Sequence, residues 1–333
     1  MRFRLCTTLA VATICLTFAD STRADAPAPQ QLLTEVVVPS TIDKSPQRVR
    51  YRLPEGAKSR AEQQDQPARP LLVMLHSWSH GIDQRFEDFE SEAIERGWIF
   101  VFPEFRGANL RPEACGSKLA QQDILDAIDW AETTFRIDEK RIYLTGISGG
   151  GHMTMLMAGK YPERFTAASA WVGISNLATW HDRHAQGKYG EMCRACCGGA
   201  PGTSATIDAE YHARSPIHFL ASAAKVKLPI DIAAGIHDGH DGSVPIRQSL
   251  DAFNQLAQQT PGAAMISEAE IAELSAKNGR LKSPRESDQE VDDTLGRAIY
   301  CRRYAGASRV TIFEGGHEGI ATAALAFLEK HAK

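Results

Sequence analysis

The chain is organised around one stretch that begins at Arg141 and ends at Ala158 and has the sequence RIYLTGISGGGHMTMLMA. Its first half is rich in β-branched and aromatic residues, which predicts a buried strand, and its second half has the apolar density of a helix. Gly146, Ser148 and Gly150 form a G-x-S-x-G pattern between the two halves. A Cβ at position 146 or 150 would crowd the neighbouring strand and helix, so the two glycines allow a sharp turn. Ser148 is expected at the apex of this turn, in a strained conformation.

A serine in this position suits nucleophilic chemistry. The turn places Ser148 at the amino end of a helix, where the free N–H of Gly149 and the helix dipole can stabilise an oxyanion. The alternative is a glycine-rich turn whose serine only caps the helix. The strand and helix patterns on either side favour the nucleophile.

Similar patterns recur along the chain and predict the fold class. Buried strands are expected at 70–76, 98–103, 165–173, 228–236 and 308–313, and helices at 84–96, 118–135, 245–259 and 319–333. Two further strands, at 34–38 and 48–53, are expected to pair antiparallel. The alternation predicts one α/β domain over residues 34–333, with a mostly parallel sheet covered by helices on both faces.

Catalytic partners for Ser148 are expected beyond the carboxyl ends of the strands, where α/β proteins carry their sites. Asp238 and Asp241 follow strand 228–236, and His317 follows strand 308–313 after two glycines. The resulting order Ser…Asp…His is that of the α/β-hydrolases, in which histidine takes the serine proton and a carboxylate orients the histidine. Asp238 is favoured because it lies closer to the strand end, and Asp241 stays open as the alternative acid.

The oxyanion of such a reaction needs a second backbone donor. The loop after strand 70–76 is the expected source, through the N–H of Trp78 or Ser77, with Gly149 as the first donor. His76 is expected to pack beneath the site. No metal and no other cofactor is expected. The aspartates at 123, 126 and 129 are expected on a solvated helix face rather than at a metal.

The amino-terminal residues predict export. Residues 1–24 have a basic start, an apolar run and small residues before a cleavage point, which is typical of a signal peptide, and residues 25–33 form a loose leader. A secreted or periplasmic protein is therefore expected. The 37 basic and 41 acidic residues form no basic patch, which argues against a nucleic-acid partner, and no later run could span a membrane.

Export also changes the interpretation of the cysteines. An oxidising compartment favours disulfides over a metal site, and Cys115 and the 193–197 cluster both follow carboxyl ends of strands. We expect Cys115 to pair with Cys196 or Cys197 and Cys301 to be a free thiol.

Several motifs together carry a family resemblance. The glycine-serine turn at 146–151, the preceding IDEKRI at 137–142, FRG at 105–107 and Val244-Pro245 resemble the catalytic domain of the prolyl oligopeptidase family. They are also similar to secreted carbohydrate and feruloyl esterases of the same superfamily. The resemblance implies an α/β-hydrolase fold, a Ser-Asp-His triad and no metal.

Three functions compete at this point. The first is a secreted serine hydrolase that cleaves a carboxylic ester, with a small-molecule or carbohydrate-ester substrate. The second is a serine peptidase for short peptides, and the third is an inactive binding protein. Two long insertions are expected to differ in role. Residues 174–227, with Trp180 and Tyr189, would form a substrate lid, and residues 260–307 an appendage at the amino edge of the sheet, away from catalysis.

Overall fold

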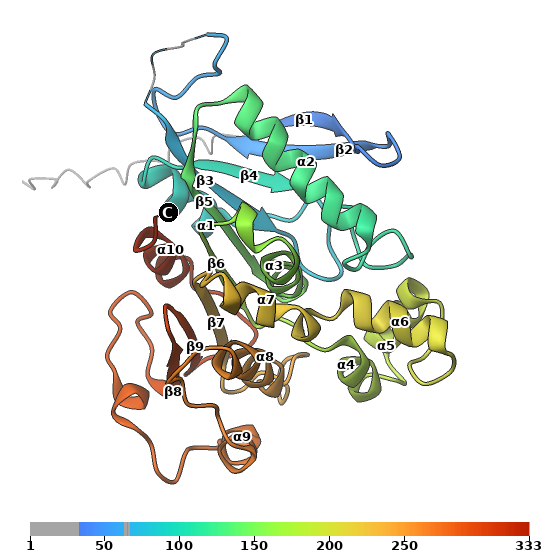
Figure 1. Ribbon diagram of the computed structural model, residues 1–333, viewed down its shortest axis with the longest axis vertical. Coiled ribbons are helices and arrows are strands. Elements are labelled where there is room, and N and C mark those ends of the chain that lie inside the picture. The colour runs from blue at the N-terminus through green and yellow to red at the C-terminus, as the bar shows by residue number, and fades with distance from the viewer. Residues whose placement is uncertain (1–32, 63–64, 66, 333) are drawn as a thin grey trace, which may run out of the picture. The chain divides into compact units, whose positions relative to one another are not determined.

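The computed structural model describes residues 33–62, 65 and 67–332 of the chain (Figure 1). The predicted signal peptide and all but the last residue of the predicted leader lie outside the described residues. Within the described part, a nine-stranded sheet has the order β1-β2-β4-β3-β5-β6-β7-β9-β8.

The sheet is parallel in its centre and antiparallel at both edges. β3, β4, β5, β6, β7 and β9 run parallel, whereas β1 and β2 at one edge and β8 at the other pair antiparallel. The predicted α/β fold is confirmed. The strands are β1 (Thr34–Pro39), β2 (Pro46–Arg52), β3 (Arg69–Leu75), β4 (Ile99–Pro103), β5 (Ile137–Ile147), β6 (Ala167–Trp171), β7 (Ile230–Gly235), β8 (Ile299–Ala305) and β9 (Ser308–Phe313).

Helices cover both faces of the sheet, as the buried central strands require. α2, α3 and α8 pack on one face, and α1 and α10 pack together on the other (Figure 1). The α-helices are α1 (Glu87–Glu95), α2 (Lys118–Thr134), α3 (Gly149–Lys160), α4 (Leu177–Arg183), α5 (Lys188–Cys197), α6 (Ala205–Arg214), α7 (Leu220–Lys225), α8 (Arg247–Gln258), α9 (Glu268–Ser275) and α10 (Ala321–Glu329).

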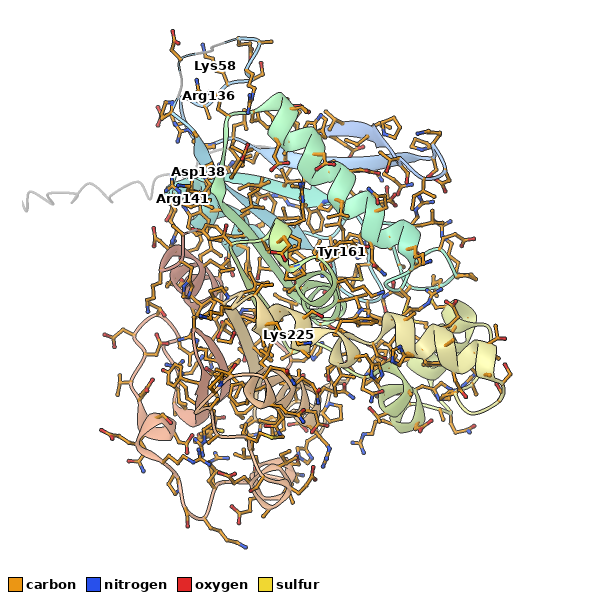
Figure 2. The ribbon with its side chains drawn as sticks, in the orientation of Figure 1. Lys58, Arg136, Asp138, Arg141, Tyr161 and Lys225 are labelled. Atoms are coloured by element: carbon orange, nitrogen blue, oxygen red, sulfur yellow. The ribbon has the colours of Figure 1, made fainter. Side chains whose placement is uncertain are left out.

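Polar contacts secure the two ends of the central strand-helix unit. Asp138 and Arg141 lie side by side at the amino end of β5 (Figure 2), and Arg141 Nε donates to an Asp138 carboxylate oxygen at 2.6 Å. At the far end of α3, the Tyr161 hydroxyl donates to Gln121 of α2 at 3.1 Å. The first contact lies within β5, and the second ties the end of α3 to α2.

The prediction of a solvated aspartate face on α2 is wrong for two of its three residues. Asp123 and Asp126 are buried. Asp123 accepts hydrogen bonds from Arg106 in the loop after β4, and Asp126 accepts two from Thr41 in the β1–β2 connection. These two aspartates are buried because two loops distant in sequence fold onto this face of the helix.

The Arg106–Asp123 pair provides a test of what holds this loop. The Asp123 side chain is 0% exposed, so Arg106→Leu would leave a buried carboxylate without its partner. We expect a loss of about 3–5 kcal/mol in the free energy of unfolding, measured by urea denaturation. Arg164→Leu is the matched control, because Arg164 pairs with the exposed Asp129 and should cost about 1 kcal/mol or less. Equal losses in the two variants would contradict this assignment.

The prediction that residues 260–307 stay at the amino edge of the sheet is also wrong. The segment supplies the edge strand β8, and its helix α9 returns to the carboxyl edge. Arg247, which opens α8 at that edge, pairs with Glu268 at the start of α9 at 2.7 Å. The imidazole of His240 in the β7–α8 loop lies 3.1 Å from the carbonyl of Ser275. An insertion of this length can fold back along the domain, and this one packs against α8.

Candidate active site

The stretch from β5 to α3 forms the sharp turn expected from its glycines. Ser148 has φ 61° and ψ −115°, a strained conformation for a residue with a Cβ. A Cβ on Gly146 would lie 2.5 Å from the backbone of Gly150, and one on Gly150 would lie 2.1 Å from the Leu75 carbonyl oxygen. Both glycines are therefore required for β5 to pass into α3 beside β3.

His317 and Asp238 meet beyond the ends of β9 and β7. His317 Nδ1 and an Asp238 carboxylate oxygen are 2.7 Å apart, which assigns the proton to Nδ1 and leaves Nε2 as the base. Asp238 is 2% exposed, and its other oxygen accepts from the N–H groups of Gly239 and Val244 at 2.9 and 3.1 Å. The structure thus pairs His317 with Asp238, whereas Asp241 is exposed.

Val244 and Gly242, neither of which the sequence had assigned a role at the acid, shape this pair. The N–H of Val244 holds the second carboxylate oxygen, and a Cβ on Gly242 would lie 2.2 Å from that same oxygen. The loop from 238 to 244 therefore closes around its own carboxylate. Gly242, seven residues after the end of β7, was the available signal, because a closed loop of this kind leaves no room for a side chain.

Ser148 and His317 open into one cavity of about 420 Å³. No hydrogen bond joins Ser148 Oγ to His317 Nε2 among the described side chains. Such contacts often tighten only when substrate binds. The cavity is lined by Ser77, Trp78, Ser79, His80, Gln84, Phe86, Ile147, Ser148, Tyr189, His317, Glu318 and Gly319.

The two candidate backbone donors after β3 differ in their partners. The N–H of Ser77 donates to the side chain of Gln84 at 2.8 Å, so it is already used. The N–H of Trp78 has no acceptor among the described residues. A Cβ on Gly149 would lie 2.2 Å from Trp78 N, so this loop closely approaches the turn. Of the two candidates, Trp78 is the one left free to act with Gly149.

Comparison with known proteins identifies the family. The sequence profile of the prolyl oligopeptidase family, described as Peptidase_S9, matches residues 85–270, which is more than half of the chain. The chain belongs to the prolyl oligopeptidase family. The resemblance inferred from its motifs is confirmed.

Relatives of this family member include esterases and peptidases. Acetylxylan esterase A of Emericella nidulans is 26% identical over 198 residues, or 56% of each chain. Feruloyl esterase B of Talaromyces funiculosus is 29% identical over 116 residues, 31% of this chain and 32% of that protein. Acylamino-acid-releasing enzyme 2 of Oryza sativa subsp. japonica is 25% identical over 59% of this chain but 26% of its own length. The alignments thus cover about half, or less, of the length of these relatives.

Solved structures agree on the fold. The Pyrococcus horikoshii acylaminoacyl peptidase matches with a TM-score of 0.53 at 21% identity, over 68% of this chain and 35% of that one. A puromycin-hydrolyzing peptidase of Mycobacterium tuberculosis matches with a TM-score of 0.54 at 19% identity, over 71% of this chain and 35% of that one. At such identities the likeness establishes the α/β-hydrolase fold alone.

The insertion at 174–227 places α4, α5 and α6 beyond the carboxyl ends of the central strands (Figure 1). Tyr189 at the start of α5 lines the cavity. Trp180 does not line it, because its ring is buried against Trp78 and its Nε1 donates to the Ser243 carbonyl at 2.9 Å. Packing is therefore the role of Trp180, and Tyr189 is the residue of this insertion that lines the cavity among the described residues.

His76 lies beneath the site, as expected. It is buried, its ring stacks on Phe105 at 3.8 Å between centroids, and its Nε2 lies 2.7 Å from the Glu104 carbonyl. Burial lowers the pKa of His76 to about 4, so the ring stays neutral near pH 7. Its role is to position the loops around the cavity.

The predicted disulfide between Cys115 and Cys196 or Cys197 is not formed in the structure. All five described cysteines are free and buried, including Cys301, which was expected to be free. Cys115 and the cysteines of α5 do gather in one cluster with Trp78 and Trp180, but as small apolar side chains that pack α5 onto the domain. Burial raises the pKa of Cys197 to about 12, which keeps it a thiol.

Two other features of the described residues bear on the site. No group of three or more His, Cys, Asp or Glu side chains in that part of the chain could hold a metal ion. Its helices are also all too short or too polar to cross a membrane.

Proposed function

We propose that this protein is a secreted or periplasmic serine hydrolase that cleaves carboxylic esters of small molecules or carbohydrates. Ser148, His317 and Asp238 are the catalytic residues. One observation carries the proposal: a histidine hydrogen-bonded to a buried carboxylate shares a cavity with a serine held in a strained turn.

The geometry assigns each group a step. Ser148 Oγ attacks the ester carbonyl while His317 Nε2 takes its proton, and Asp238 stabilises the imidazolium that forms. The N–H groups of Gly149 and Trp78 receive the developing oxyanion. The C–O bond to the alcohol then breaks, and His317 returns the proton to the leaving oxygen. Water, activated by the same histidine, attacks the acyl-enzyme, and the acid leaves as Ser148 is restored.

Ester cleavage is supported by the esterases among the relatives. The acetylxylan esterase is 26% identical over 56% of each chain, and the feruloyl esterase is 29% identical over 116 residues.

A peptidase is the second candidate, because of Glu318 in the cavity wall next to His317. A carboxylate there could bind the amino terminus of a short peptide. Its oxygens already accept from the Gly316 N–H at 3.1 Å and lie 3.4 Å from Arg297, which weakens this interpretation. An inactive binding protein is disfavoured, because the histidine and the carboxylate are in hydrogen-bond contact.

A panel of substrates on one purified sample tests the assignment. We expect hydrolysis of p-nitrophenyl esters and of acetylated or feruloylated sugars, with no measurable release from aminoacyl p-nitroanilides. Glu318→Gln serves as the internal control, since it should leave ester hydrolysis within a few-fold. Anilide cleavage with kcat/KM on the order of 10⁴ M⁻¹s⁻¹, abolished in Glu318→Gln, would establish the peptidase instead.

Export is tested separately. Cells expressing the full chain should release a mature protein that starts at Asp25, the residue after the predicted cleavage point. Replacement of Leu9 and Val11 by lysines should keep the protein inside the cell at full length. Wild-type protein that stays inside the cell at full length would contradict the proposal.

The contact between α9 and the loop that carries Asp238 predicts that the insertion at 260–307 has a role in catalysis. Ile271 and Ala272 of α9 share a second cavity with Asp238 and Ile246. Replacing residues 262–296 by a short linker should therefore loosen the loop that carries Asp238, and kcat/KM should fall about 10–100-fold. The comparison is made on samples that unfold cooperatively. Val291→Ala is the control, because Val291 is 90% exposed in the same insertion. An unchanged kcat/KM in the shortened protein would disprove this role.

A further inference from the structure

Within the described chain, Tyr189 is the one residue of the 174–227 insertion that lines the cavity shared by Ser148 and His317. We infer that Tyr189 is a binding platform for a flat ring in the acyl part of the substrate, so that the preferred substrates are esters of aromatic acids. The inference rests on the proposed function and narrows its substrate class.

The Tyr189 ring is held rigidly from behind. The rings of Trp180 and His184 lie 5.0 and 5.4 Å from it, between centroids. Trp180 Nε1 donates to the carbonyl of Ser243 at 2.9 Å, and His184 Nε2 lies 2.7 Å from that same oxygen. Two rings are therefore anchored on one carbonyl of the loop from 238 to 244, and they fix the position of the tyrosine relative to Asp238. A ring supported in this way is pre-organised to receive a ligand.

The hydroxyl of Tyr189 has no role in the fold. Its oxygen has no hydrogen-bond partner among the described residues, whereas the buried Tyr211 of the same insertion donates to the Gly199 carbonyl at 3.1 Å. A tyrosine in an interior or an interface normally satisfies its hydroxyl while its ring supplies apolar contact. Tyr189 is only half-buried and lines the cavity, so part of its side chain is available to a molecule there.

The position of Tyr189 indicates which half of the ester it meets. His317 must return its proton to the leaving alcohol, so the alcohol departs on the side of His317, Glu318 and Gly319. Tyr189 belongs instead to the aromatic group of Trp78 and Trp180, whose rings are 4.6 Å apart, next to the oxyanion donor. The acyl group therefore extends toward Tyr189.

The experiment varies the acyl group at a constant alcohol, with p-nitrophenyl acetate, butyrate, benzoate and cinnamate. Wild-type protein should prefer the aromatic acids. Tyr189→Ala should lower the ratio of kcat/KM for cinnamate over acetate about tenfold, and Tyr189→Phe, which keeps the ring, should stay within about twofold. Trp180→Ala removes the support and should give an intermediate loss. Circular dichroism and thermal unfolding confirm that each variant is folded.

Three results are decisive. An equal fall for cinnamate and acetate in Tyr189→Ala would overturn the inference and leave Tyr189 a packing residue. In a second series that varies the alcohol at constant acetate, a selective fall for aryl acetates over alkyl acetates would place the ring on the alcohol side and overturn the acyl assignment. If wild-type protein cleaves only anilides, the proposed ester function fails. The Tyr189 test then compares Phe with Ala anilides, where loss of the aromatic preference supports the platform and an equal fall refutes it.

Discussion

Ser148→Ala should abolish hydrolysis of every ester that the wild-type protein cleaves, with kcat reduced by about 10³-fold or more. The hydroxyl is the group that would form the acyl-enzyme, and alanine leaves only binding and the oxyanion donors to act on the substrate. Ser148 is at the amino end of α3, with φ 61°. Alanine carries the same Cβ as serine, so the strained turn is unchanged and the protein should fold as before.

The measurement is the release of p-nitrophenol, together with covalent labelling by a fluorophosphonate probe. Wild-type protein should be labelled at Ser148, and the variant should not react. Thermal unfolding of the two proteins should coincide, which separates loss of chemistry from loss of structure. Labelling of Ser148→Ala at the wild-type rate would place the nucleophile at another residue.

Asp238→Asn should have the second largest effect, a loss of about 10³–10⁴-fold in kcat. The carboxylate accepts the Nδ1 proton of His317 at 2.7 Å and would stabilise the imidazolium that forms during attack. An asparagine amide can instead donate to Nδ1, which moves the ring proton to Nε2 and removes the base that faces Ser148. The shape of the side chain is nearly unchanged, so the loss reports the tautomer and the charge.

Asp241→Asn is the matched control for this variant. Asp241 lies three residues away in the same loop, but it is exposed and has no hydrogen bond or ion pair through its side chain among the described residues. Its replacement should leave kcat/KM within about twofold, as for a surface substitution. A large loss in Asp241→Asn with near-normal activity in Asp238→Asn would reverse the two assignments.

The fold could be predicted because its signals are local. Gly146 and Gly150 flank Ser148, and a Cβ added at either position would lie only 2.1–2.5 Å from backbone atoms of a neighbouring element. The central strands are continuous apolar runs because both faces of a parallel sheet are covered. These properties belong to short windows of sequence, so the α/β class, the strand-turn-helix at Ser148 and the family motifs could all be inferred from the order of the amino acids.

The choice between neighbouring residues was less accessible: Asp238 was favoured over Asp241 by its distance from the strand end, but Ser77 and Trp78 stayed open. Asp238 and Asp241 follow the same strand, and Ser77 and Trp78 follow another. Asp238 reaches His317 because its loop closes on the N–H of Val244. The N–H of Trp78 stays free because the side chain of Gln84 accepts from Ser77 instead. Both are contacts between residues several positions apart, and spacing alone does not reveal them.

The amino-acid pattern was therefore sufficient for the sheet, the serine turn and the carboxyl edge as the place of chemistry, since each follows from local sterics and hydrophobic periodicity. Tertiary packing settled the rest. It buried Asp123 against Arg106, gathered the cysteines as unpaired thiols, and brought α9 back to the loop of Asp238. The physical reason is that these contacts join segments far apart in the chain, whose meeting depends on how long insertions pack against the finished sheet.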